Sequence, residues 1–397
     1  MTRRVCMPAD IRFPLERANG VQIVKTAAAL ARGGSDVTLL VRRSDERPTA
    51  EILQSYGVEA LPALHVRRLP VLHRRGWFAV PRVTFLLRAG LAAGGSLCRG
   101  DVVYTRDLQL ADWLLRLPRQ RPRLVYEAHA VEASMYAERA ALYGSAERFD
   151  PRKGRRIAAR EGRVWSQAAG VVVTTAGIRD TLTDIHGSRS RVQVIPNGCD
   201  VAAGQEFPGL TVGRPARILY AGQLYPWKGV DVLVDAMTRV HGARLVILGG
   251  IPGEKDMQRV QRRVQEQGLA QRVELRGSVP QVQVARELEQ AAVVAVPFLK
   301  SAMTERHTSP IKLFEALAAA RPVVASDLPS SREVLRHEDN ALLVPPGDPV
   351  ALAAALQRLL DDAALAERLA RAAAADARHY SWDARARRLA ALFAELP

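Results

Sequence analysis

The feature that most constrains the fold is an alternation, repeated along the chain, between short apolar runs and helical stretches. Runs rich in β-branched residues occur at residues 4–7, 36–41, 101–104, 123–126, 170–174 and 191–195, and again at residues 217–221, 244–249, 272–276, 292–296 and 322–326. The runs show no alternation of polar and apolar side chains, which is typical of parallel strands covered by helices on both faces. The pattern therefore predicts an α/β fold with two doubly wound, Rossmann-like domains.

The length of the chain supports two domains, because 397 residues exceed what one ordinary hydrophobic core accommodates. We expect residues 1–195 to form the N-terminal domain and residues 216–378 the C-terminal domain. Residues 196–215 are expected to be a linker, since Asn, Gly and Pro interrupt every periodic pattern there. The amphipathic segment within residues 379–397 is expected to form a last helix.

A helix that begins near Ser309 carries the strongest local signal for a binding site. Ser309 is a natural N-cap, and Pro310 at the first helical position loses no needed N–H group. The free backbone N–H groups up to Ile311, together with the positive end of the helix dipole, form a site for an anion. Glu315 lies farther along the same helix, where its carboxylate can accept hydrogen bonds from sugar hydroxyls. A phosphate site beside such a carboxylate is typical of a nucleotide-sugar pocket.

A second anion-binding feature follows the predicted strand at residues 217–221. Gly222 and Gln223 come directly after this strand, and Lys228 stands at the start of the next helix. A glycine here lets the backbone approach a diphosphate closely, and the lysine supplies a positive charge for it. Because ligands bind at the carboxyl ends of parallel strands, we expect this loop to bind the diphosphate at that edge of the sheet. No Asp-x-Asp motif and no His, Asp or Glu cluster with metal-ligand spacing accompanies it, so no metal or other cofactor is expected.

Together these motifs resemble those of the retaining, GT-B-fold glycosyltransferases of the large family four. The resemblance is carried by residues 17–21, 195–200, 219–229 and 309–318, which are spread in order over nearly the whole chain. It implies a GT-B architecture, in which an N-terminal acceptor-side domain and a C-terminal donor domain face each other across a cleft and the last helix crosses back to the N-terminal domain. It also implies transfer of a hexose from a nucleotide diphosphate sugar to an acceptor hydroxyl, with retention, by a front-face mechanism and without metal.

The resemblance assigns roles to residues in both domains. In the first domain, His129 would lie over the sugar, and Asn19, Arg106 and Glu127 would contact donor or acceptor. The implied donor-binding residues are Gly20, Gly222, Gln223, Lys228, His307, Ser309, Pro310, Ile311 and Glu315. Lys228, which would face the leaving diphosphate, and Glu315, which would face the ribose hydroxyls, join His129 as the candidate catalytic residues.

Three positions depart from the family's pattern. Gln223 stands where an arginine often accompanies the lysine, and His307 replaces the first carboxylate of the E-x7-E motif, for which Glu305 is an alternative. Ala320 stands where a glycine usually ends the helix, and a left-handed alanine there costs about 1 kcal/mol. The departures at His307 and Gln223 leave open a non-catalytic protein that kept the fold. A second alternative is a nucleotide-sugar epimerase on the same fold, for which Glu127 and His129 would be the acid–base pair.

The net charge of +16 indicates either attraction to an anionic surface or a composition in which most arginines are simply solvated. Arginine runs without interleaved aromatic residues argue against nucleic acid. Residues 67–88 mix arginines with Trp77 and Phe78, as segments at a membrane surface do, although a helix of the N-terminal domain with snorkelling arginines is the favoured interpretation. Peripheral contact with an anionic membrane is therefore kept as the alternative.

The remaining composition is that of a soluble globular protein. No apolar run approaches the roughly 20 residues of a membrane-spanning helix, and the N-terminal apolar stretch is too short for a secretory signal. Cys6, Cys98 and Cys199 are too far apart to suggest a zinc site or a disulfide framework. We therefore expect a cytoplasmic enzyme, and the sequence leaves the acceptor open among glycans, lipid-linked sugars and small molecules.

Overall fold

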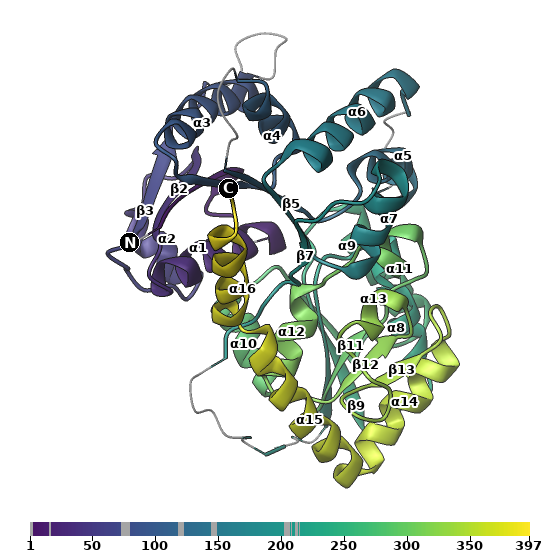
Figure 1. The fold of residues 1–397 in the computed structure, drawn as a ribbon. Coiled ribbons are helices and arrows are strands. Elements are labelled where there is room, and N and C mark those ends of the chain that lie inside the picture. The colour runs from purple at the N-terminus through teal and green to yellow at the C-terminus, as the bar shows by residue number, and fades with distance from the viewer. Residues whose placement is uncertain are drawn as a thin grey trace. The chain divides into compact units, whose positions relative to one another are not determined.

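The computed structural model describes residues 3–15, 17–72, 80–117, 123–143, 149–201, 207, 209–210, 213 and 215–397. The described chain divides into two compact units (Figure 1). The first contains the described residues of Met1–Ala137, Phe149–Pro196 and Trp382–Pro397, and the second contains those of Glu138–Arg148 and Asn197–Ser381. Residues 202–206, 208, 211, 212 and 214 of the expected linker at residues 196–215 lie outside the described residues.

In the first unit, the described residues form a parallel sheet of seven strands in the order β3-β2-β1-β4-β5-β6-β7. The strands are β1 (Arg4–Phe13), β2 (Asp36–Arg43), β3 (Leu64–Leu69), β4 (Val102–Thr105), β5 (Leu124–Ala128), β6 (Gly170–Val173) and β7 (Val192–Val194). Val5 of β1 lies opposite Val37 of β2 on one side and Val102 of β4 on the other. The strand order reverses between β1 and β4, and such a reversal opens a crevice at the carboxyl ends of the two strands.

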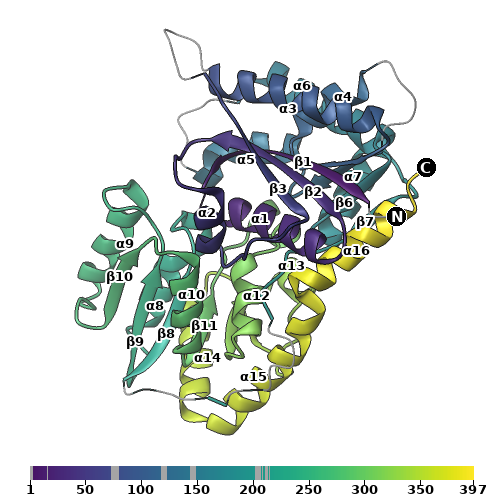
Figure 2. The same ribbon diagram turned by 90° about the vertical axis from the view of Figure 1, so that its left-hand side faces the viewer.

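Helices cover both faces of this sheet (Figure 2). One face carries α1 (Ala18–Arg32), and α16 (Trp382–Ala394) packs on α1. The opposite face carries α3 (Val80–Cys98) and α4 (Leu108–Leu115), and α6 (Pro151–Gln167) packs on α4. The other helices are α2 (Thr49–Ser55), α7 (Ala176–His186) and α5 (Glu132–Tyr143), whose residues from Glu138 on are counted with the second unit. Because α1 lies between the sheet and α16, it is buried on all sides from Gly20 to Ala31, which explains its run of small apolar residues.

The described residues of the second unit form a parallel sheet of six strands in the order β10-β9-β8-β11-β12-β13. The strands are β8 (Ala216–Ala221), β9 (Ala243–Leu248), β10 (Val273–Gly277), β11 (Val293–Val296), β12 (Val323–Ser326) and β13 (Leu342–Val344). One hydrophobic core lies under α8 (Val230–Ala236), α9 (Lys255–Glu266) and α14 (Pro349–Asp361). The other lies under α10 (Gln281–Glu289), α12 (Ile311–Ala318) and α15 (Ala363–Ala377).

The prediction of two doubly wound, Rossmann-like α/β domains is confirmed, and each predicted strand is present within a few residues of its expected bounds. Two edge strands, β3 and β13, were not predicted. The interpretation of residues 67–88 as one helix is wrong at its start, because residues 67–69 belong to β3 and the helix α3 begins at Val80. Residues 73–79 of that segment lie outside the described residues.

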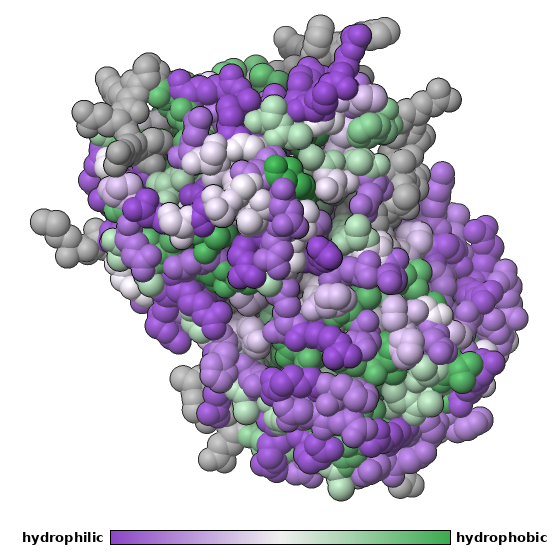
Figure 3. All heavy atoms as spheres, turned by 45° about the vertical axis from the view of Figure 1, so that its right-hand side comes forward, coloured by the Kyte–Doolittle hydropathy of each residue, from purple (hydrophilic) through white to green (hydrophobic). Residues whose placement is uncertain are grey.

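The surface is dominated by polar side chains. Hydrophilic residues cover most of the face shown in Figure 3, and hydrophobic residues form small groups between them. None of the helices in the described ranges is both long enough and apolar enough to cross a bilayer.

Candidate functional site

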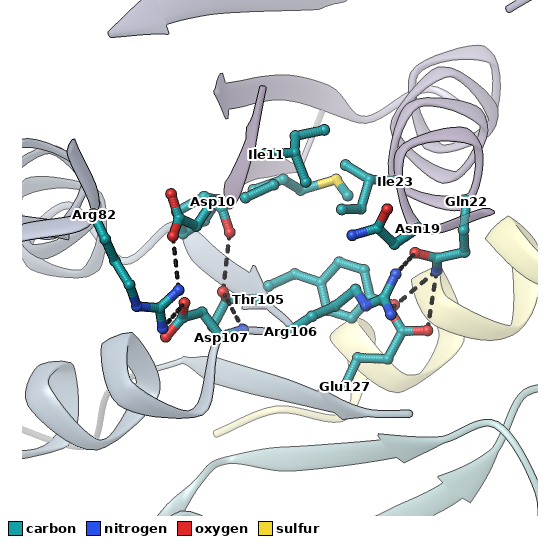
Figure 4. A pocket seen from close by; sticks show the side chains of 14 residues that line it. Asp10, Ile11, Asn19, Gln22, Ile23, Arg82, Thr105, Arg106, Asp107 and Glu127 are labelled. Atoms are coloured by element: carbon teal, nitrogen blue, oxygen red, sulfur yellow. Dashed lines mark hydrogen bonds and ion pairs between the residues drawn. The ribbon is translucent and has the colours of Figure 1, made fainter. Parts of the chain in front are cut away.

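A pocket opens in the first unit at the carboxyl ends of β1 and β4, where the strand order reverses (Figure 4). It has a volume of about 180 Å³. Its lining is mostly polar and includes Asp10, Asn19, Gln22, Arg82, Thr105, Arg106, Asp107 and Glu127. Of the residues predicted from the sequence, Asn19, Arg106 and Glu127 are thus brought together here. Gly20 follows Asn19 at the start of α1, where a side chain would collide with the Leu15 carbonyl oxygen, 2.0 Å from the position of a Cβ atom.

Arg106 follows β4 and is directed toward Gln22 and Glu127 (Figure 4). Its Nη1 atom donates a hydrogen bond to Oε1 of Gln22 at 2.8 Å. Burial lowers the pKa of the Arg106 guanidinium, although the nearby carboxylate of Glu127 acts in the opposite direction. Arg106 therefore presents a poorly hydrated cation at the pocket, suited to an anionic or hydroxyl-rich ligand.

Glu127, near the end of β5, is the centre of a buried polar network. The Tyr104 hydroxyl and the Arg385 guanidinium donate to its carboxylate, and Nε2 of Gln22 donates at 3.1 Å. Burial alone would raise the pKa of Glu127, but the charge of Arg385, together with His129 and Arg106, holds it well below its ordinary value. Glu127 is therefore a fixed carboxylate whose oxygens are already occupied.

His129 lies just beyond β5, with Nε2 at 2.9 Å from Oε1 of Glu127. Burial and the charge of Arg106 lower the pKa of His129 to about 4. The imidazole is consequently neutral near pH 7, so it can exchange hydrogen bonds with a sugar hydroxyl but brings no positive charge.

The opposite wall of the pocket is a chain of ion pairs. Arg82 of α3 lies 2.7 Å from Asp10 and 3.0 Å from Asp107, and Arg42 pairs with Asp10 as well. Asp107 also caps α4, because its side chain accepts a hydrogen bond from the Leu110 N–H group. This wall is a set of mutually neutralised charges that fixes the end of β1 to the starts of α3 and α4.

In the second unit, Gly222 and Gln223 follow β8, and their loop lies against the loop that follows β9. The Gly222 N–H group donates to the Leu248 carbonyl at 2.8 Å, and a Cβ atom on Gly249 would lie 1.8 Å from the Gly222 carbonyl oxygen. Gly229 adopts a left-handed conformation with φ 71°, and a Cβ atom there would lie 1.7 Å from the Pro297 carbonyl oxygen. The bare backbone of this region thus depends on glycine for close packing.

Lys228 ends a 3₁₀ turn (Pro226–Lys228) just before α8. Its ammonium lies 4.0 Å from the ring centre of Trp227 and 4.3 Å from that of Phe298. Burial lowers the pKa of Lys228 to about 7. Within the described residues no carboxylate forms an ion pair with it, so the half-buried Lys228 amine is in contact with aromatic faces and has no anionic partner.

Glu315 lies on α12 and is mostly buried. Lys312 of the same helix places its Nζ atom 2.9 Å from one carboxylate oxygen, and the amide of Gln281, from the start of α10, donates to the other. The site around Glu315 is therefore a cluster of Glu315, Lys312 and Gln281, of which the sequence indicated only the carboxylate.

The prediction that Ser309 caps this helix is wrong by one residue. The helix α12 begins at Ile311, and Pro310 occupies the N-cap position without a side-chain hydrogen bond. The Ser309 hydroxyl instead accepts a hydrogen bond from the Asn197 N–H group at 3.2 Å, and the Ser309 carbonyl accepts one from the Asn197 amide at 2.6 Å. The prediction for Ala320 is confirmed, since this residue has φ 54°.

His307 directly follows the short helix α11 (Ala302–Arg306) and is largely buried. Burial and the charge of Arg306 lower the pKa of His307 to about 4. It therefore stands as a neutral imidazole where the sequence motif has a carboxylate. Glu305, the alternative carboxylate, lies 3.3 Å from the exposed Lys300.

Comparison with known proteins decides the family. The model described as "Glycosyl transferase 4-like domain" matches residues 19–198, and the model described as "Glycosyl transferases group 1" matches residues 215–362. The chain belongs to the group 1, GT-B-fold glycosyltransferases. This confirms both the resemblance of the sequence motifs and the expectation of a transferase that acts on nucleotide-sugar-type chemistry.

Individual proteins agree with the family. The glycosyltransferase is 29% identical to a D-inositol 3-phosphate glycosyltransferase of Xylanimonas cellulosilytica over 94% of this chain and 91% of that protein. It is 36% identical to a phosphatidyl-myo-inositol mannosyltransferase of Mycobacterium leprae over 48% of this chain and 50% of that protein. Among solved structures, a sucrose-phosphate synthase from Thermosynechococcus elongatus has a TM-score of 0.74 at 21% identity, covering 99% of this chain and 98% of that one. Anabaena HepE, solved with UDP and glucose, has a TM-score of 0.72 at 15% identity, with both chains fully covered.

Several residues of the pocket in the first unit, of the network around Glu127 and of the cluster around Glu315 were not predicted from the sequence: Asp10, Gln22, Arg82, Tyr104, Gln281, Lys312 and Arg385. Two of them leave a signal. Gln22 is a polar residue in the apolar run of α1, and Arg385 lies on the buried face of the amphipathic last helix. Among the described residues, no group of three or more His, Cys, Asp or Glu side chains is arranged to hold a metal ion.

Proposed function

We propose that this enzyme transfers a hexose from a nucleotide diphosphate sugar to an acceptor hydroxyl, with retention of configuration and without a metal ion. The observation that carries the proposal is Lys228, a half-buried lysine that lies against aromatic rings beside the glycine loop that follows β8, with its pKa lowered to about 7 by desolvation. A desolvated, unpaired ammonium is costly, and a diphosphate is the partner that would compensate it. The solved relative HepE binds UDP and glucose, which supports a nucleoside diphosphate as the leaving group.

The donor's remaining contacts are assigned to the second unit. Glu315 accepts hydrogen bonds from the ribose hydroxyls, and the N–H groups of Ser309 and Ile311, on either side of Pro310 at the start of α12, face the phosphates. Gly222 and Gln223 offer backbone to the diphosphate, and His307 offers a hydrogen bond to the sugar. In the first unit, Arg106 and Asn19 contact the acceptor, and Gly20 and His129 complete the surroundings of the transferred sugar.

A front-face reaction fits the state of the carboxylate in the first unit. Glu127 is held by Tyr104, Gln22 and Arg385, so it is not free to attack a sugar carbon as a nucleophile. In the proposed step the bond from the anomeric carbon to the diphosphate breaks, and the acceptor oxygen bonds to the same face. The acceptor's proton moves to the departing phosphate oxygen, and Lys228 balances the charge that develops there.

The proposal is tested by incubating the purified enzyme with a panel of nucleotide sugars and measuring free nucleoside diphosphate with and without acceptor extracts. Acceptor-dependent release supports transfer. Interconversion of the nucleotide sugars without net consumption would show an epimerase, and no turnover with any donor would indicate a non-catalytic protein.

The metal-independent mechanism predicts that transfer continues at near full rate in excess chelator. The leaving diphosphate is neutralised by Lys228 and by backbone N–H groups, so no divalent cation is needed for it. The measurement is the initial rate in EDTA against the rate with added magnesium or manganese. Activity that is abolished by EDTA and restored by either metal would contradict the proposal.

We further propose that the first unit contacts an anionic membrane surface through α3. Val83, Leu87 and Leu91, four residues apart on one face of this helix, are 57%, 55% and 73% exposed. Beside them a groove of about 360 Å³ is lined by apolar side chains, by Gln109, and by Arg116 and Arg160, which both lie within ion-pair distance of Asp112 at the same groove. An apolar stripe flanked by guanidinium groups is complementary to acyl chains below anionic headgroups.

Serine substitution at Leu87 and Leu91 is expected to weaken binding to vesicles containing phosphatidylglycerol at least tenfold, without lowering Tm, because both side chains are exposed. Cosedimentation measures the binding, and Ile185→Ser, an exposed isoleucine on α7, is the matched control. Equal binding by the double variant and the control, or no binding by the unaltered enzyme, would contradict the proposal.

A further inference from the structure

We propose that Arg385, on the last helix, is a positioning residue for glycosyl transfer, acting through Glu127 on His129 and on the Gln22–Arg106 pair at the pocket. The inference rests on the proposed function, because it takes His129 and Arg106 as the groups that meet sugar and acceptor. It adds a residue of α16 to the machinery, although this helix is separated in sequence from every other element of the pocket.

The guanidinium of Arg385 is fixed on every side. The residue is 3% exposed, and its Nη1 atom donates to the carbonyl oxygens of Ile195 and Pro196, each at 2.7 Å. Its Nη2 atom donates to the Tyr104 hydroxyl at 3.1 Å and to the Glu127 carboxylate, and its Nε atom donates to the Thr26 hydroxyl at 3.3 Å. A planar donor held at five points imposes one orientation on the carboxylate it meets.

Glu127 passes this orientation on to the pocket. The residue is 1% exposed, and its Oε1 atom lies 2.9 Å from Nε2 of His129 and 3.1 Å from Nε2 of Gln22. Because the Gln22 amide group donates to Glu127, its oxygen faces the other way and accepts from Arg106 at 2.8 Å. The carboxylate beside Nε2 likewise favours the His129 tautomer that is protonated at Nε2, which leaves Nδ1 as the acceptor.

Without the Arg385 charge, the orientations of the Gln22 amide and the His129 imidazole would no longer be fixed. Glu127 would remain buried between Tyr104, His129 and Gln22 and would lose the largest charge that lowers its pKa, leaving only the smaller effects of His129 and Arg106, so its pKa would rise and protonation would be favoured. A protonated Glu127 would be a weaker acceptor for the Gln22 amide and would no longer place a negative charge beside Nε2 of His129. Arg106, held in place through Gln22, would lose its support as well. Loss of Arg385 would therefore displace His129 and Arg106 and would also lower the stability of the first unit.

The test compares Arg385→Met and Arg385→Lys with Arg387→Met, the same substitution at an exposed position of the same helix. Arg385→Met is expected to lower kcat by a factor on the order of ten to one hundred, since small displacements of reacting groups have effects of this size. Affinity for the free nucleoside diphosphate, which binds in the second unit, should not change. Arg385→Lys should recover part of kcat, and Arg387→Met should match the unaltered enzyme.

A double variant, Arg385→Met with Glu127→Gln, separates positioning from folding. It removes the unpaired buried charge, so Tm should recover relative to Arg385→Met alone, while kcat should stay low because the carboxylate is gone. Recovery of Tm and kcat together would show a purely structural role and overturn the inference, as would wild-type kcat in a folded Arg385→Met variant. The unaltered enzyme is assayed alongside: if it shows no acceptor-dependent transfer, the proposed function fails and the inference fails with it. If the unaltered enzyme transfers the sugar and the Arg385 variants have the same kcat as the unaltered enzyme, the inference fails but the proposed function stands.

Discussion

Replacing Lys228 with alanine is expected to lower kcat about 100- to 1000-fold while the KM for the donor changes much less. Gln223 brings no second charge to the loop, so the negative charge that develops on the leaving diphosphate falls on this ammonium and on backbone N–H groups. An interaction that strengthens as the bond breaks acts on the transition state more than on the bound substrate. Steady-state kinetics with a saturating acceptor measures the two parameters separately.

The matched control is Lys255→Ala, which removes an exposed lysine at the start of α9 and should leave both parameters unchanged. A Lys228→Ala enzyme that keeps its turnover and only binds the donor more weakly would contradict the assignment. In that case Lys228 would stabilise substrate and transition state equally.

The low pKa of Lys228 adds a proton-linkage test of the same assignment. In the free enzyme, burial lowers this pKa to about 7, and a bound diphosphate raises it again. Between these two values the free amine must take up a proton to bind, so affinity for a nucleoside diphosphate should fall as the pH rises above about 7. Calorimetry at pH 8 in buffers of different ionisation enthalpy should detect proton uptake, and Lys228→Met should abolish it.

Glu315→Gln is expected to weaken binding of the free nucleoside diphosphate by up to about 1.5–3 kcal/mol, or roughly 10- to 150-fold, because that is the worth of the charge-assisted hydrogen bond to the ribose that is lost. The glutamine has nearly the same shape, and Gln281 remains beside it. Glu289→Gln, at an exposed end of α10, controls for loss of a surface charge. Unchanged affinity measured by calorimetry would rule out the ribose contact.

The fold was largely accessible from the sequence because buried parallel strands are continuous apolar runs. Strands such as Gly170–Val173 and Val293–Val296 are buried along their whole length, so their apolar composition alone predicts them. The strand β3 lies at an edge, contains His65, Arg67 and Arg68, and is only partly buried, so its residues gave no such signal. The strand β13 is the other edge and has only three residues.

Candidate site residues could be predicted from the sequence only where they belong to a short local motif. Lys228 and Glu315 stand in short, ordered motifs, whereas Gln281 and Lys312 matter through side-chain contacts that no spacing predicts. Ser309 was misassigned for the same reason, since its hydroxyl is occupied by Asn197, a partner distant in sequence. Arg385 meets Glu127 only after the last helix has packed on α1, so no local reading of either segment predicts their ion pair.

The most direct test of retaining transfer is the anomeric configuration of the glycoside produced from an α-linked nucleotide sugar. The enzyme is incubated in EDTA with the donor and an acceptor that it glycosylates, and the product is examined by proton NMR. The coupling constant of the anomeric proton distinguishes an α from a β linkage for a gluco-configured sugar. We predict an α-linked glycoside together with an equal amount of free nucleoside diphosphate. A β-linked product, or an altered nucleotide sugar with no glycoside formed, would contradict the account.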